Sequence, residues 1–207
     1  DRAENGTGLA IAPRGEWLIT QGYLKPFAAV RHVHYGAEAA RRWCERVGSS
    51  SGEIDAISLT VYPEAVTYCG NRAPRTAIAA QFSLTYGIAH MLVERSLGPG
   101  AYTADALTPP ETMRLEQLIT VTARPGATPD RRYATLEITT ASGVGETVHI
   151  DGVLGDGANP MTVADVTAKF EEYSDWLPQP WGAGSVAEAI VNGPRDAPLA
   201  SVIDGSV

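Results

Sequence analysis

Residues 76–95 read TAIAAQFSLTYGIAHMLVER, a run that is apolar on nearly every side of a helix. Phe82 and Tyr86 fall on one side at a spacing of four, whereas Leu84 and Ile88 fall on others. A helix that is apolar all round is buried in a protein interior. The run therefore predicts a central helix, with Phe82 in the core.

Strand-forming patterns lie on both sides of this run. Residues 57–61 alternate between aliphatic and hydroxyl side chains, which is typical of a strand with one buried face. Short turns between successive strands favour antiparallel pairing, and three more strands are expected around residues 119–124, 133–139 and 147–151. With a further helix near residues 35–47, the pattern predicts an α+β fold, an antiparallel sheet of about four strands covered by helices.

Short sequence motifs in the rest of the chain indicate where two helices begin and where the domain ends. Pro109-Pro110 is expected to begin a short helix, and Thr162 with Asp165 three residues later is typical of a capped start of another. Prolines and a glycine follow Trp176 and indicate the end of the domain. We expect a loose lead-in over residues 1–16, one domain over 17–176 and a C-terminal tail over 177–207.

Composition and charge exclude several classes of protein. The 207 residues are 44% hydrophobic and 19% charged, as in a globular rather than a disordered chain. A net charge of −8 argues against a nucleic-acid or anionic-membrane surface, and no apolar run approaches the roughly 18 residues that span a bilayer. Cys44, Cys69 and the four histidines lack metal-ligand spacing. We expect reduced thiols, no metal and a cytoplasmic protein.

Cationic and titratable side chains gather in residues 24–34, LKPFAAVRHVH. A lysine at a turn can hold a carboxylate or, when desolvated, exchange a proton, and an arginine can bind a carboxylate through two hydrogen bonds. Lys25 and Arg31 are therefore candidate carboxylate contacts, and His32 and His34 are candidates for ligand binding or acid–base work. The alternatives are a solvated lysine, a structural ion pair and structural histidines.

Several short motifs follow one another in the chain: Lys25-Pro26-Phe27, Cys69-Gly70-Asn71, residues 81–86, Asn159-Pro160-Met161 and Lys169-Phe170. Their order and spacing resemble the MmgE/PrpD family, which includes 2-methylcitrate dehydratase, cis-aconitate decarboxylase and iminodisuccinate epimerase. The resemblance is to the C-terminal domain of that family and covers roughly residues 17–176. Ala28 stands where the family usually has proline, and Val30 stands where it tends to have cysteine or histidine.

The resemblance implies a lyase or isomerase of the dehydratase, decarboxylase or epimerase type, acting on a small di- or tricarboxylate without a metal or organic cofactor. It places Lys25, His34 and Tyr86 among the catalytic candidates and Arg31 and His32 among the substrate contacts. Tyr86 is expected either to donate to a developing oxyanion or to be a core tyrosine with a satisfied hydroxyl.

Family members also have an N-terminal helical domain with further proposed catalytic groups, and nothing in this sequence resembles it. The resemblance therefore implies a homodimer or a helical partner chain, and predicts that the 207 residues alone do not turn over 2-methylcitrate or cis-aconitate. The alternative is a stand-alone module derived from this domain. It would be a biosynthetic cyclase or isomerase for a larger apolar intermediate, or a non-catalytic binding or assembly protein, and Ala28 and Val30 favour it.

Overall fold

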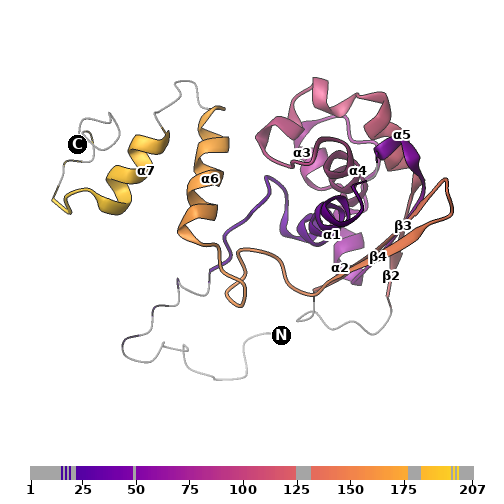
Figure 1. Cartoon of the computed structure of the whole chain (residues 1–207), viewed down its shortest axis with the longest axis horizontal. Coiled ribbons are helices and arrows are strands. Elements are labelled where there is room, and N and C mark those ends of the chain that lie inside the picture. The colour runs from indigo at the N-terminus through magenta and orange to yellow at the C-terminus, as the bar shows by residue number, and fades with distance from the viewer. Residues whose placement is uncertain are drawn as a thin grey trace, which may run out of the picture.

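The computed structural model describes residues 15, 17, 19, 22–48, 50–124, 132–176, 183–196, 198 and 200. A four-stranded sheet lies against a layer of helices, so the α+β prediction is confirmed (Figure 1). The helices are α1 (Arg31–Val47), α2 (Pro63–Cys69), α3 (Ala77–Gln81), α4 (Leu84–Glu94), α5 (Pro110–Leu118), α6 (Val163–Ser174) and α7 (Ala183–Asn192). The strands are β1 (Ile54–Val61), β2 (Ile119–Ala123), β3 (Ala134–Thr140) and β4 (Gly145–Ile150). Short 3-10 helices occupy Ser51–Glu53, Pro99–Tyr102 and Asp105–Leu107.

The strand order is β2-β1-β3-β4, and the sheet is mixed. β1 pairs antiparallel with β3, and β3 pairs antiparallel with β4. β2 instead pairs in parallel with β1, where Ile57 lies opposite Ile119. The predicted antiparallel pairing of β2 with β3 is therefore wrong. Parallel neighbours need a long crossover connection, and the segment containing α2 to α5 provides it.

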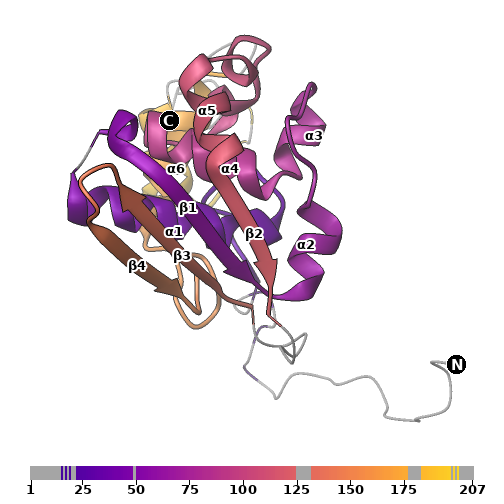
Figure 2. The ribbon, with the colours of Figure 1, turned by 90° about the vertical axis from the view of Figure 1, so that its right-hand side faces the viewer.

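The two faces of the sheet differ in polarity. The face toward the helices is buried and aliphatic, with Leu59 opposite Leu136 and Leu136 opposite Val148. Figure 2 looks onto the other face, where the strands lie in front of α1 and where Glu137, Thr147 and His149 are exposed. The alternation seen in the sequence thus places the core between the sheet and the helices.

Two glycines bring α1 and α4 close together in that core. A β-carbon at Gly36 would lie 2.9 Å from Cδ1 of Ile88, and one at Gly87 would lie 2.5 Å from Cγ1 of Val33. A larger residue at either position would therefore force Ile88 or Val33, or the helix that carries it, to shift. Gly48, at φ 63°, ends α1 as predicted, although the helix begins earlier than expected, at Arg31.

The predicted continuous helix over residues 77–95 is interrupted at Phe82 and Ser83. The Ser83 hydroxyl accepts a hydrogen bond from the N–H of Tyr86 (3.1 Å) and donates one to the carbonyl of Asn71 (2.7 Å), so Ser83 caps a new helix. Phe82 then points away from the core and is 39% exposed. The prediction that Phe82 belongs to the core is wrong, because periodicity alone does not reveal a serine cap inside an apolar run.

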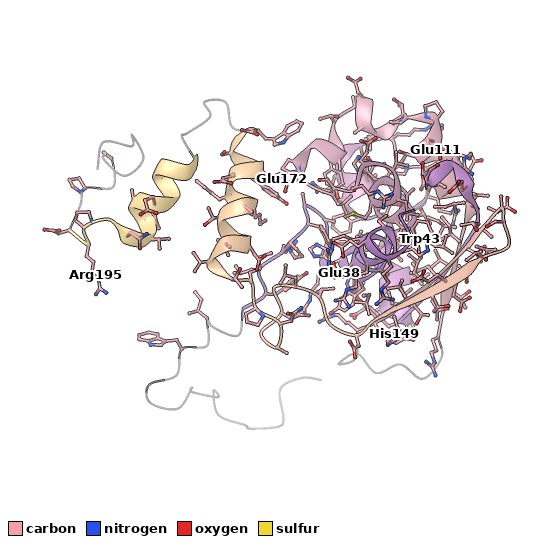
Figure 3. All side chains as sticks on the ribbon, in the orientation of Figure 1. Glu38, Trp43, Glu111, His149, Glu172 and Arg195 are labelled. Atoms are coloured by element: carbon pink, nitrogen blue, oxygen red, sulfur yellow. The ribbon has the colours of Figure 1, made fainter. Side chains whose placement is uncertain are left out.

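α6 packs beside the segment that precedes α1 (Figure 1). The predicted capped start at Thr162 and Asp165 is confirmed, with each side chain bonded to the backbone of the other. Glu172, labelled in Figure 3, accepts a hydrogen bond from the Ser96 hydroxyl at 3.1 Å. A β-carbon at Gly100 would lie 2.8 Å from the Trp176 ring, so a glycine there lets the end of α6 approach closely.

α7 lies in the expected C-terminal tail and packs on α6, where Val186 is 2% exposed. Within the part of the chain that the structure describes, no helix has the length and apolar character needed to cross a membrane.

Candidate functional site

An open pocket of about 320 Å³ lies between the segment before α1, the α3–α4 junction and α6. Its walls are partly apolar and partly cationic. The lining residues are Lys25, Phe27, Ala28, Ala29, Val30, Gln81, Phe82, Lys169 and Tyr173. The interruption between α3 and α4 is what brings Gln81 and Phe82 to this pocket, since a continuous helix would turn those positions elsewhere.

Backbone hydrogen bonds hold residues 24–30 in place on three sides. The N–H of Ala28 donates to Leu97, and that of Val30 donates to Gln81 (2.9 and 3.1 Å). The N–H of Leu24 donates to the carbonyl of Gly155 at 3.0 Å. The backbone that carries Lys25 is therefore positioned by three separate parts of the fold, which favours a preformed site.

Both lysines of the chain line this pocket. The other fourteen basic residues are arginines, so lysine occurs only at positions 25 and 169. Among the described residues, no carboxylate forms an ion pair with Lys25 or Lys169. Burial lowers the pKa of Lys169 below its ordinary value, the negative charge of Glu172 opposes that shift, and the positive charge of Lys25 adds to it. The pocket thus concentrates positive charge that the described chain does not neutralise by ion pairing.

Tyr173 accompanies Lys169 on α6. The ammonium of Lys169 lies 4.6 Å from the centre of the Tyr173 ring, within the range of a cation–π contact. The Tyr173 hydroxyl is buried and has no hydrogen-bond partner among the described residues. A buried hydroxyl normally has a partner, so the hydroxyl of this lining residue has an unmet capacity to donate a hydrogen bond.

His34 lies beneath the pocket segment and supports it. Its Nε2–H donates to the carbonyl of Ala29 at 3.0 Å, and its Nδ1 accepts from the hydroxyl of Tyr23. The side chain is 0% exposed, and burial lowers its pKa to about 4, so the ring is neutral near pH 7. This arrangement holds the backbone of Ala29, one of the lining residues.

Arg31 forms an ion pair with Asp156, and its guanidinium lies 4.3 Å from the centre of the Tyr23 ring. Asp156 also accepts from the N–H of Val153 at 3.3 Å. Arg31 therefore ties the first turn of α1 to the turn that follows β4, and its charge is already compensated.

The structure does not bring His32 or Tyr86 to the pocket. Nδ1 of His32 lies 2.6 Å from the hydroxyl of Tyr62, and its ring stacks on Tyr68. Tyr86 is 1% exposed, and its hydroxyl donates to backbone carbonyls at Ala101 and Ala106. Of the five candidates from the sequence, only Lys25 lines the pocket, with His34 and Arg31 close behind it.

Sequence reasoning gave no role to Lys169, Tyr173 or Gln81. Lys169 entered only as a member of the Lys169-Phe170 motif, without a function. One signal was present in the sequence, since a chain with fourteen arginines uses lysine only twice.

The two cysteines are buried, which raises the pKa of both thiols, that of Cys69 to about 12. Among the described residues, no group of three or more His, Cys, Asp or Glu side chains could hold a metal ion.

The fold and site define an α+β domain in which the segment before α1 and helix α6 form an open pocket lined by two lysines. Residues 27–180 match the MmgE/PrpD C-terminal domain, and the chain belongs to the MmgE/PrpD family. A search of curated proteins finds no match.

Proposed function

We propose that this chain provides the carboxylate-binding part of a cofactor-independent lyase or isomerase that acts on a small di- or tricarboxylate. The observation that supports it most directly is the placement of both lysines of the chain on one pocket without an ion-pair partner among the described residues. A positive charge in a partly apolar pocket attracts an anionic ligand more strongly than the same charge does in water.

Dehydration, decarboxylation and epimerisation of such acids share one difficulty, because negative charge builds up next to a carboxylate in the transition state. Lys25 and Lys169 would stabilise that charge. Burial lowers the pKa of Lys169, which favours a role for this lysine in passing a proton.

Dehydration and epimerisation also need a base for the carbon-bound proton, and the described lining residues include no carboxylate or imidazole. His34 already has partners on both nitrogens. We propose that the base belongs to a helical partner domain or to a second copy of the chain, placed over the open side of the pocket. Covering the pocket would also exclude water and strengthen the electrostatic contribution of both lysines.

A second function is supported by the apolar part of the lining. Phe27, Ala28, Val30 and Phe82 offer more hydrocarbon surface than a small citrate-like acid uses. The alternative is a binding module or biosynthetic isomerase for a larger acid with an apolar body, with its carboxylate on Lys25 and its hydrocarbon part along these four side chains.

Calorimetric titration of the chain with cis-aconitate, 2-methylcitrate and a medium-chain fatty acid tests the proposal. Saturable binding that falls roughly tenfold or more in Lys25→Met is expected, since an unscreened charge contact is lost. Arg195→Met is the matched control, because it removes one positive charge from an exposed position far from the pocket (Figure 3). Binding of only the fatty acid would support the second function. No binding of any of the three, or equal losses in both variants, would contradict the proposal.

A further inference from the structure

The wall that α6 contributes to the pocket carries a second binding element, and this inference rests on the function proposed above. We propose that Lys169 and the hydroxyl of Tyr173 bind a second acidic group of a ligand whose first carboxylate is bound by Lys25. The pocket then selects diacids over monoacids of the same length.

The two lysines reach the pocket from different parts of the fold. Lys25 comes from the turn before α1, and Lys169 comes from the middle of α6. Both line the same pocket, where the charge of Lys25 disfavours the charged form of Lys169 and the charge of Glu172, one turn further along α6, favours it. A ligand with two negative charges relieves the repulsion between two ammonium groups in one pocket, whereas a ligand with one negative charge relieves it only partly.

Tyr173 supports the assignment independently of charge. Its hydroxyl is buried and lacks a hydrogen-bond partner among the described residues, while its ring lies under the Lys169 ammonium. One carboxylate has two oxygens, so it can accept from the hydroxyl of Tyr173 and also approach the ammonium of Lys169. A ligand with a single acidic group held by Lys25 leaves the hydroxyl without an acceptor, which is unfavourable in a buried position.

The position of α6 is set by contacts outside the pocket. Glu172 accepts from Ser96, and Trp176 packs against Gly100 on the 3-10 helix Pro99–Tyr102. These contacts flank Tyr173 on the C-terminal half of α6 and dock it against the main body. The second binding element is therefore a preformed wall, which limits the ordering that a ligand must cause.

Succinate and butyrate are suitable probes, because they share a four-carbon chain and differ by one acidic group. Because the chain has only two lysines, reductive methylation with carbon-13 formaldehyde gives one NMR signal for each, apart from that of the N-terminal amine. Titrations follow each signal separately and yield a dissociation constant for each probe. We expect the whole chain to bind succinate roughly tenfold more tightly than butyrate, and succinate to shift both lysine signals.

Lys169→Gln is expected to reduce the preference for succinate to about threefold or less and to leave butyrate affinity within about twofold. Tyr173→Phe should lower the affinity for succinate but not that for butyrate. Lys169→Arg, which retains the charge, should keep more of the preference for succinate over butyrate than Lys169→Gln does. Thermal denaturation of each variant checks that α6 stays docked, and Tyr173→Phe provides the test should Lys169→Gln fail to fold.

Equal affinity of the chain for succinate and butyrate, with binding still dependent on Lys25, would overturn this inference and leave the proposed function standing. Equal losses for both probes in Lys169→Gln would also overturn it, because Lys169 would then act as a general charge. Failure of both probes to bind, or binding that Lys25→Gln does not affect, would count against the proposed function itself.

Discussion

A β-carbon at Gly155 would lie 1.8 Å from the carbonyl oxygen of Leu24, the residue before the first pocket lysine. The N–H of Leu24 in turn donates to the carbonyl of Gly155. Gly155 has φ +92°, a conformation that side-chain-bearing residues rarely adopt. The turn after β4 thereby sets the position of the turn that carries Lys25.

Gly155→Ala is expected to displace Leu24 and Lys25, lowering carboxylate affinity roughly tenfold or more and destabilising the fold by about 1–3 kcal/mol. Gly143→Ala is the matched control, because Gly143 has φ +80° but nothing within 4 Å of an added β-carbon. It should lose stability only and keep ligand affinity. Titration calorimetry and urea unfolding measure both quantities, and similar effects on affinity in the two variants would contradict the explanation.

His34 should make the fold acid-sensitive. Burial lowers its pKa from 6.5 to about 4, so the unfolded chain binds a proton in this range that the folded chain does not. The contribution of His34 to the free energy of unfolding is therefore complete above pH 6.5. It is lost as the pH falls toward 4, and the loss is about 3 kcal/mol in total. Unfolding free energies between pH 4 and 7.5 measure it.

The control for this pH dependence is His149→Gln, a change at an exposed histidine on the outer face of the sheet (Figure 3). His34→Gln should lower overall stability and flatten the slope of stability with pH between pH 4 and 6.5, and it should flatten that slope more than His149→Gln does. An unchanged slope in His34→Gln would show that another group causes the acid sensitivity.

Lys169 should titrate below an ordinary lysine, and the charge of Lys25 should be part of the cause. Burial lowers the pKa of Lys169, the negative charge of Glu172 raises it, and the positive charge of Lys25 lowers it. Lys25→Met is therefore expected to raise that pKa, while burial keeps it below the ordinary value. The carbon-13 signal of methylated Lys169, followed from pH 7 to 11, gives the result. An unchanged or lower pKa in Lys25→Met would show that the two ammonium groups do not interact.

Phe82→Ala should cost much less stability than a core substitution on the same segment. Phe82 is 39% exposed, whereas Leu84, two residues later, is 1% exposed. Leu84→Ala is expected to destabilise by about 2–5 kcal/mol and Phe82→Ala by about 1 kcal/mol. Chemical denaturation compares them, and a loss for Phe82→Ala as large as that for Leu84→Ala would place Phe82 back in the core.

The fold was predictable where a local pattern determines the structure. The alternation in residues 57–61 identified β1, Gly48 ended α1, and Thr162 with Asp165 began α6. Strand order was not predictable in this way, because β2 pairs with β1 through backbone hydrogen bonds between segments that are distant in the sequence. The kink at Ser83 also depends on a distant group, the carbonyl of Asn71.

The candidate site was predictable only in part. Lys25 was found because a lysine beside Pro26 at a turn is a recognisable pattern. Lys169 is far from it in sequence, and only the docking of α6 by Glu172 and Trp176 brings it to the same pocket. The roles of the other candidates depend on burial, which the sequence does not show. The sequence around Tyr86 does not reveal whether its hydroxyl binds a ligand or, as here, backbone carbonyls.

The position of β1 inside the sheet has a consequence for the order in which the domain assembles during translation. β1 needs both β2 and β3 as neighbours, and Ile57 meets Ile119 on one edge and Ile138 on the other. The ribosome releases β1 first, so its second edge stays open until residues 134–140 have emerged. Until then the nascent chain exposes an unpaired, aliphatic strand edge, which is a site for mispairing and for chaperone contact. Both edges of β1 are therefore paired only after the synthesis of β3, and α6, which follows β4 in the chain, can complete the lysine pocket only after that step.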